Sequence, residues 1–256
     1  MQNSKRQFYL KSDAERIEWM AKIREAMGYS HLFSFYDIKG LLGKGSYAEV
    51  RSANHRLAKM EVAVKILKKV SMTEKQIENA RYEIETLKIC QHPNIMRLYE
   101  IFENADNIYL VLEYLTGGNL YEHLRENGFS ITEVSACKYV YSVACALKYM
   151  HSCGIIHRDI KPENIVLANT KVGSDIKIVD FGLAKILGPG ELASEAVGTL
   201  CYAAPEILLG HQYNNKADMW SLGILSYLLL VGKLPFSDKT SEKKIAMYAH
   251  FCFNLI

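Results

Sequence analysis

The sequence predicts an α+β chain of two lobes, and three observations support that expectation. Short β-rich segments, separated by glycine-rich or polar turns, fill residues 35–114. Beyond Gly117 and Gly118 the periodicity becomes mainly helical. Strands followed by helices, divided by a short glycine-containing connection, are typical of two lobes with a cleft between them.

Composition and charge indicate a globular protein and exclude several classes. The 256 residues are 49% hydrophobic and 23% charged, and 31 basic against 28 acidic side chains give a net charge of +3. So small an excess argues against a nucleic acid or a charged membrane surface as partner. The polar N-terminus is unlike a signal peptide, and the longest apolar stretch, residues 222–231, is about half as long as a transmembrane helix.

The cysteines indicate a reducing compartment. They form no C-x-x-C pair and lie in apolar or helical patterns, where thiols behave as small hydrophobic groups. We therefore expect a cytoplasmic protein with reduced, buried cysteines. They are Cys90, Cys137, Cys145, Cys153, Cys201 and Cys252.

Residues 1–30 are expected to form a short unit of their own, a strand end and an amphipathic helix. Phe8 and Leu10 alternate with polar neighbours, and Ser12 opens a sequence with the spacing of a capping box. So short a unit cannot bury its apolar face alone, and we expect it to pack on another part of the protein. The face consists of Met20, Ile23 and Met27.

Two interpretations of this unit stay open. Either its helix packs on the domain that follows, or residues 7–26 are the remnant of another domain. They resemble the last strand and C-terminal helix of a pleckstrin-homology domain, with Trp19 as the tryptophan typical of that helix. The sequence lacks the rest of such a domain, so contact with membrane lipid is expected only if a longer product contains it.

Alternation and turn residues predict a sheet and one helix before residue 115. The helix is expected at residues 73–89, where apolar positions recur on one face. Farther along, a long helix with an apolar stripe is expected around residues 140–150, and a wholly buried one at residues 220–231. The strands are expected at residues 36–42, 50–54, 61–67, 95–102 and 108–114.

A glycine-rich segment lies between the first two expected strands. Gly43 and Gly45 would let backbone amides close over phosphate groups without obstruction by a Cβ atom. Ala48 replaces a third glycine, and no G-K-[ST] sequence opens a helix here, so the segment is not a Walker A loop. Taken alone, it is better explained by an ordinary hairpin turn.

Lys65 shares one face of the third strand with Ala63. The small alanine leaves room for a flat ring beside a fixed positive charge, although a solvated lysine is the commoner explanation for a single such residue. Glu83 lies next to the buried stripe of the following helix. Because an unpaired buried carboxylate costs several kcal/mol, Glu83 needs a cation, and Lys65 is the candidate.

Residues 157–164 have the sequence H-R-D-I-K-P-E-N, the most specific segment of the chain. Asp159 supplies a carboxylate that can orient a hydroxyl, Lys161 a cation for a transferring phosphoryl group, and Asn164 an amide for a metal ion. Asp180 begins a D-F-G turn 21 residues after Asp159, and an A-P-E sequence follows at residues 204–206. A charged surface turn would not carry these groups in this order.

Together these segments resemble a protein kinase over nearly everything from Tyr36 to Phe236. Lys161 and Thr199 are similar to the serine/threonine-specific branch, and the glycine-containing connection and residues 218–236 to the calcium/calmodulin-dependent kinase group. The resemblance does not imply regulation by calmodulin. It implies a bilobal kinase domain at residues 31–256, with a small antiparallel β lobe and one helix at 35–115 and a mainly helical lobe at 116–256.

The resemblance also implies an activity, the transfer of the ATP γ-phosphate to serine or threonine hydroxyls of proteins. Lys65, held by Glu83, would bind the α- and β-phosphates. Asp159 would accept the hydroxyl proton as catalytic base, and Lys161 would steady the γ-phosphate.

The resemblance further assigns the metal and the nucleotide. Asn164 and Asp180 would hold Mg²⁺ through oxygen atoms, the ligands this ion prefers. The implied nucleotide-binding residues are Leu42, Gly43, Gly45, Val50, Ala63, Lys65, Leu112, Glu113, Leu115 and Val166.

Four residues are expected to regulate activity: Arg158, Ser194, Glu195 and Thr199. Glu195 stands where many relatives carry a phosphorylated threonine, which an arginine at the position of Arg158 meets. One hypothesis is that Glu195 partly mimics that phosphate and gives some activity without an upstream kinase, although it has fewer charges and acceptor atoms. A solvated loop glutamate explains the residue equally well.

Two further departures concern substrate and completeness. Asn119 and Leu228 stand where many arginine-directed relatives have acidic side chains, so an arginine preference is in doubt although Glu163 remains. Only 38 residues follow Asp218 (256 minus 218), which implies an incomplete large lobe, exposed apolar surface on the 220–231 helix, and lower stability or self-association. The alternative function is therefore a catalytically impaired fragment that binds nucleotide as a scaffold or decoy.

Overall fold

The computed structural model describes residues 12–26, 31–45, 48–171 and 173–236. They fall into two compact units, one within residues 1–72 and 99–112 and the other within 73–98 and 113–256. This division differs from the expected boundaries, because residues 73–98, which include the helix expected at residues 73–89, and residues 113–115 group with the second unit, and residues 1–30 group with the first.

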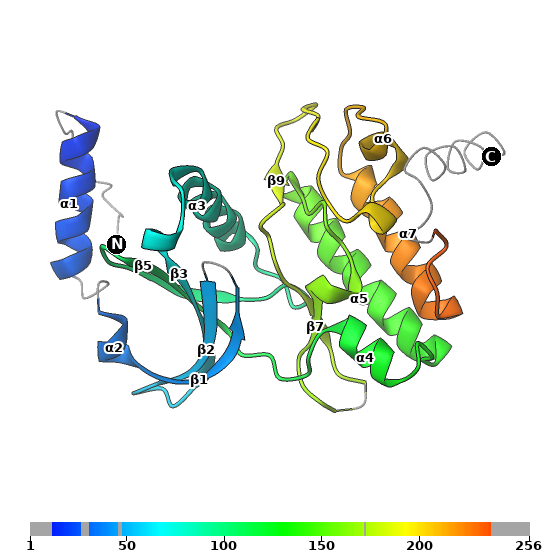
Figure 1. Ribbon diagram of the computed structural model, residues 1–256, viewed down its shortest axis with the longest axis horizontal. Helices are drawn as coiled ribbons and strands as arrows, with labels where there is room; N and C mark the ends of the chain where they lie inside the picture. The colour runs from blue at the N-terminus through cyan, green and yellow to red at the C-terminus, as the bar shows by residue number, and fades with distance from the viewer. Residues whose placement is uncertain (1–11, 27–30, 46–47, 172, 237–256) are drawn as a thin grey trace, which may run out of the picture. The chain divides into compact units, whose positions relative to one another are not determined.

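The first unit contains a five-stranded sheet in the order β1-β2-β3-β5-β4 (Figure 1). β1, β2 and β3 pair antiparallel, as expected for strands joined by short turns. The expected strand at residue 95 begins only at Leu98, since Ile95 instead forms a single bridge with Ile178. The strands are β1 (Tyr36–Lys44), β2 (Ala48–His55), β3 (Glu61–Lys68), β4 (Leu98–Glu103) and β5 (Asn107–Glu113).

One face of this sheet carries the core of the first unit. The short helix α2 (Leu32–Phe35) places Leu32 in a cluster with Tyr36, Val64 and Phe102. The Tyr36 hydroxyl donates to Glu100 Oε2 at 2.8 Å, and its pKa is raised by burial and by that carboxylate. The tyrosine therefore stays neutral while its polar atom is satisfied.

The N-terminal helix α1 (Asp13–Ala26) begins as expected but does not bury its apolar face. Ser12 Oγ accepts a hydrogen bond from the Glu15 amide at 3.2 Å, which confirms the expected cap. Met20 and Ile23 are 43% and 42% exposed, so the expectation that this face is covered is wrong for the described residues. The residues expected at the strand end and at the end of the helix face, Phe8, Leu10 and Met27, lie outside the described residues, and the pleckstrin-homology resemblance stays a prediction.

The second unit is mainly helical. Two of its long helices, α5 and α7, pack against each other (Figure 1). Short strands pair as β6 with β9 and β7 with β8. The helices are α3 (Glu74–Ile89), α4 (Leu120–Glu126), α5 (Glu133–Ser152), α6 (Pro205–Leu208) and α7 (Lys216–Val231). The strands are β6 (Ile155–Ile156), β7 (Ile165–Leu167), β8 (Ile176–Ile178) and β9 (Lys185–Ile186).

Capping boxes begin two of these helices. Thr73 Oγ1 accepts from the Gln76 amide while the Gln76 side chain accepts from the Thr73 amide. Asn119 and Glu122 make the same reciprocal pair at the start of α4. Each cap satisfies backbone amides that lack a partner within the helix, and the Asn119 side chain is therefore committed to a structural contact.

The helix expected to be wholly buried, α7, is exposed along one side. Leu222, Ile224 and Leu225 are buried, but Tyr227 is 40% and Leu230 62% exposed. A continuous apolar run specifies a helix that can be buried all round, but only neighbouring elements can cover it, and those described leave this side open. For the described residues, the expectation of exposed apolar surface on this helix is therefore confirmed, and the expectation that the helix is wholly buried is wrong.

The cysteines are only partly as expected. Cys90 and Cys201 are buried, Cys145 and Cys153 half-buried, and Cys137 is exposed, because it lies on the outer side of α5. Burial raises the pKa of the Cys90 thiol to about 12, which keeps it protonated. Among the described residues, no helix combines the length and the apolar character needed to cross a bilayer.

The α5 core generates a stability prediction. Leu147 is fully buried and Val134, on the same helix, is 80% exposed. Leu147→Ala should lower the free energy of unfolding by about 2–5 kcal/mol through lost burial and a residual cavity, whereas Val134→Ala should change it by less than about 0.5 kcal/mol. Chemical denaturation of both variants measures this, and equal changes would contradict the packing of α5.

Candidate active site

The second unit gathers two of the expected site residues, Lys161 and Asn164, around one buried carboxylate, that of Asp159. Asp159 is 8% exposed and lies in the loop between β6 and β7. Its Oδ2 lies 2.8 Å from Lys161 Nζ and accepts from Asn164 Nδ2 at 2.9 Å. The Asn164 amide also donates to the Asp159 carbonyl at 2.9 Å, so the loop closes on itself.

Thr199 joins this cluster from far along the chain. Lys161 Nζ donates to Thr199 Oγ1 at 2.7 Å, and the Thr199 hydroxyl donates to Asp159 Oδ1 at 2.7 Å. Both Asp159 oxygens are thus occupied. Burial raises the pKa of the carboxyl, but the hydrogen bonds from Lys161, Thr199 and Asn164 outweigh it, so the pKa lies below its ordinary value and Asp159 is ionised near neutral pH.

Asp218 of α7 holds the backbone on which the cluster is built. It is 1% exposed, and its two oxygens accept from the His157 amide at 3.0 Å and the Arg158 amide at 2.8 Å. His151 Nε2 lies 2.8 Å from the same carboxylate. Arg158 has a φ of 69°, a left-handed conformation that is rare outside glycine, and these bonds fix it directly before Asp159.

Sequence reasoning noted Asp218 only as part of a motif and missed His151. The sequence feature that could have indicated these contacts is a single carboxylate near the start of a strongly apolar helix, because a buried charge requires nearby hydrogen-bond donors.

Asp180 lies at a turn after β8 and is exposed. It has a φ of 62°, and its Oδ1 accepts from the Gly182 amide at 3.2 Å. A Cβ atom on Gly182 would lie 3.2 Å from that oxygen and 3.9 Å from Glu83 Oε2, so Glu83 of α3 reaches this turn. Phe181, which lies between Asp180 and Gly182 in the sequence, is buried. Its ring packs edge-on to the His157 ring, with the ring centroids 5.3 Å apart.

The donors of Asn164 and Asp180 fit a divalent cation of the Mg²⁺ type. The Asn164 amide nitrogen donates to Asp159, so its side-chain oxygen is not used in those two bonds. Asp180 adds an exposed carboxylate. A hard cation prefers such oxygen ligands and keeps several waters or phosphate oxygens besides.

Glu195 of the segment after β9 is paired with two cations. Its Oε1 lies 2.7 Å from Lys185 Nζ and its Oε2 3.1 Å from Arg158 Nη1. The Tyr213 hydroxyl donates to the Glu195 carbonyl at 2.7 Å, and the Ser194 amide to Oε2 at 3.2 Å. The hydrogen bond from Lys185 and the backbone amides lower the pKa of Glu195 to about 2.

Glu195 is therefore not simply solvated, although its side chain is 47% exposed. The sequence suggested its pairing with Arg158 but gave no sign of Lys185, ten residues earlier.

The remaining expected residues divide between the two units. In the first unit, Val50 pairs with Gly43 on one side and with Lys65 on the other. Ala63 and Leu112 are buried, whereas Leu42 is 47% exposed and Gly45 is exposed.

In the second unit, Glu113 Oε2 lies 2.9 Å from Lys177 Nζ, and Val166 pairs with Lys177 in β7–β8. Leu115 and Val166 are half-buried. The convergence of both sets on one nucleotide, and the pairing of Lys65 with Glu83, stay predictions.

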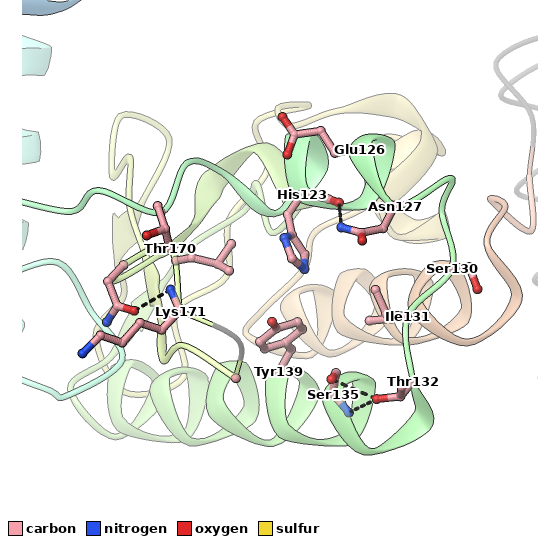
Figure 2. Close-up of a pocket in the computed structure, with 14 residues that line it drawn as sticks. His123, Glu126, Asn127, Ser130, Ile131, Thr132, Ser135, Tyr139, Thr170 and Lys171 are labelled. Carbon is pink, nitrogen blue, oxygen red and sulfur yellow. Dashed lines mark hydrogen bonds between the residues drawn. The ribbon is translucent and has the colours of Figure 1, made fainter.

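The second unit also has a hollow of about 510 Å³ between α4, the start of α5 and the β7–β8 loop (Figure 2). His123 and Tyr139 point into it, and Thr132 and Ser135 at its rim are bonded to each other as the cap of α5. None of the residues assigned above to the metal, the nucleotide or catalysis lines it. It is thus separate from the Asp159 cluster.

Comparison with known proteins shows which family has these motifs. The protein kinase domain model matches residues 36–254. A myosin light chain kinase A from Dictyostelium discoideum is 37% identical over 205 residues, which cover 80% of this chain and 69% of the relative. Rat serine/threonine-protein kinase SIK1 is 39% identical over 203 residues, 79% of this chain but 26% of the relative.

A second Dictyostelium discoideum protein, also named as a myosin light chain kinase, is 42% identical over 202 residues, 79% of this chain and 58% of the relative. The chain thus spans 26% to 69% of the length of these relatives. A family model covering most of the chain, together with serine/threonine kinases as relatives, confirms the resemblance drawn from the motifs and the α+β fold. The chain belongs to the protein kinase family.

Proposed function

We propose that the chain is a serine/threonine protein kinase that transfers the γ-phosphate of ATP to hydroxyl groups of a protein substrate. The observation that carries the proposal is the contact set of Asp159 with Lys161, Asn164 and Thr199. Phosphoryl transfer needs positioning and charge compensation more than covalent chemistry, and these residues provide both. Buried free thiols such as Cys90 support a cytoplasmic location.

Asp159 serves as the base in this proposal. Its lowered pKa leaves it ionised and able to accept the proton of a substrate hydroxyl. Lys161, 2.8 Å away, compensates the negative charge on the carboxylate and on the incoming phosphoryl oxygens. Thr199 holds both residues, so that a hydroxyl entering this loop displaces one hydrogen bond to Asp159.

Lys65, held by Glu83, is proposed to bind the α- and β-phosphates, beneath the backbone of Gly43 and Gly45. Asn164 and Asp180 would hold Mg²⁺, which neutralises phosphate charge when bound. The adenine is proposed to lie against the apolar residues assigned above. These are Leu42, Val50, Ala63, Leu112, Leu115 and Val166, with the backbone at Glu113 along the edge of the ring.

The alternative of a scaffold or decoy has no observation in its favour. A non-catalytic module has no use for an ionised Asp159 with both oxygens bonded, and this cluster is complete.

We also propose that Glu195 replaces a phosphorylated residue as the anion that orders the segment before A-P-E. It meets Arg158, as a phosphate would, and Lys185 as a second cation. Arg158 directly precedes Asp159, and its Nε also donates to the Leu183 carbonyl at 2.6 Å, so an anion at Glu195 connects the catalytic loop with the segment after D-F-G.

The transfer itself is tested with Asp180→Ala. With radiolabelled ATP, Mg²⁺ and a general protein substrate, the wild-type chain should transfer phosphate and Asp180→Ala should lose about 100- to 1000-fold in kcat, the range for loss of a charge-stabilising group. Asp175→Ala, an exposed aspartate paired with Lys138 at 2.9 Å, is the matched control. Equal and negligible transfer by the wild type and Asp180→Ala would favour the scaffold instead.

The anion hypothesis is tested with Glu195→Ala in phosphatase-treated protein. Because the ion pairs are partly exposed, the expected loss in kcat is about fivefold, equivalent to ~1 kcal/mol. Glu191→Ala should retain wild-type activity, since this exposed glutamate bonds only locally to the Gly188 amide among the described residues. Unchanged activity of Glu195→Ala would contradict the role of the anion.

The same residue gives a prediction about pH. The pKa of Glu195 is depressed from 4.5 to about 2, so its contribution to stability is fully present above pH 4.5 and is lost as the pH falls toward 2. Glu195→Gln should therefore be less stable than wild type at pH 6, and the difference should shrink at pH 3. Thermal unfolding at both values measures it, and a difference independent of pH would refute the assignment.

A further inference from the structure

We propose that Tyr82 is a positioning residue, which ties helix α3 to β9 in the segment after D-F-G and so holds Glu83 at the Asp180–Gly182 turn. The proposal rests on the proposed kinase function and names a residue that the family resemblance does not assign. The contact that carries it is a hydrogen bond of 2.7 Å from the Ile186 amide to Tyr82 Oη, between residues 104 apart in sequence.

The pairing of β9 explains why the Ile186 amide needs this acceptor. The Leu187 amide donates to the Gly154 carbonyl at 2.7 Å, next to the antiparallel pair Ile155–Ile186. Amides alternate in direction along a strand, so the Ile186 amide points away from β6. Tyr82 supplies the acceptor on that open edge.

Tyr82 and Glu83 are neighbours on α3, and both side chains reach the segment that begins at D-F-G. Tyr82 contacts residue 186, and Glu83 Oε2 lies 3.9 Å from the Cβ position of residue 182. Successive helical residues differ in direction by about 100°, because a turn contains 3.6 residues. The Tyr82 bond therefore limits rotation of α3 about its axis, and with it the direction in which Glu83 leaves the helix.

The C-terminal end of α3 is held separately. Tyr149 of α5 donates to the Ile89 carbonyl and accepts from the Gln91 amide, each at 3.0 Å. The end of the helix is thus anchored to α5, and the Tyr82 contact decides how the part that carries Glu83 is turned.

Tyr82 is also linked to the anion site. Lys185, the neighbour of Ile186 in β9, has its Nζ 2.7 Å from Glu195 Oε1. Contacts thus run without a break from Glu195 through Lys185 and Ile186 to Tyr82, which is adjacent to Glu83. The anion at Glu195 therefore fixes β9 on one side, and Tyr82 transmits the position of β9 to α3. Such a path is established only by measured coupling, which a double-mutant cycle supplies.

Tyr82→Phe tests the proposal. It removes one oxygen from a side chain that is 41% exposed, so global stability should hardly change. Hydrogen exchange at the Ile186 amide should accelerate, and kcat/KM should fall about two- to tenfold, as expected for one hydrogen bond. Tyr141→Phe, 72% exposed on α5, is the control and should change neither quantity.

A double-mutant cycle with Glu195→Gln completes the experiment. If Tyr82 acts through β9, its substitution should cost less than about twofold in kcat/KM once Glu195 no longer holds the strand. Faster exchange at Ile186 with unchanged kcat/KM, or fully additive losses, would overturn the proposal. An inactive wild-type chain would instead refute the kinase function, and exchange at residues 180–187 and in α3 would still decide whether Tyr82 positions the helix.

Discussion

The buried carboxylate of Asp159 requires hydrogen-bond donors and a cation, and three side chains of the second unit provide them. Lys161 and Asn164 come from the same loop, but Thr199 lies 40 residues farther along the chain and reaches Asp159 only when the intervening segment is ordered. Removing a charge from water is costly unless its oxygens are bonded. The hydrogen bond from Thr199 therefore links the Asp159 carboxylate to the segment that follows Asp180.

The same constraint, that a buried carboxylate needs hydrogen-bond donors, also applies to Asp218. Asp218 is an ion inside an apolar helix, and three donors at His151, His157 and Arg158 satisfy it. In return it maintains a left-handed residue directly before Asp159, a conformation of order 1–3 kcal/mol above the usual ones. The left-handed conformation before Asp159 is thus maintained by contacts with a residue of α7, 59 positions farther along the chain than Asp159 (218 minus 159).

The sequence predicted structure that is determined locally, but it did not predict contacts between distant segments. The segment from His157 to Asn164 carries its chemistry in eight consecutive residues, so its assignment followed from spacing, and the Ser12 cap was equally local. Lys185 and Tyr82 escaped prediction, since nothing in their own neighbourhoods indicates what they meet. Periodicity shows which face of a helix is apolar but not what covers it, which is why the α1 face and one side of α7 were expected to be buried.

Weak contacts explain how one side chain can regulate such a network. A partly exposed ion pair like that of Glu195 contributes only about 0–1 kcal/mol, too little to order a long segment alone. Besides this ion pair, β9 has backbone pairing with β6 and the Tyr82 hydrogen bond, and each contact lowers the entropy that the others must overcome. Loss of any one of these contacts is therefore expected to weaken the other two. In our proposal Glu195 takes the place of a phosphate as the anion of this set, with one charge where a phosphate has nearly two.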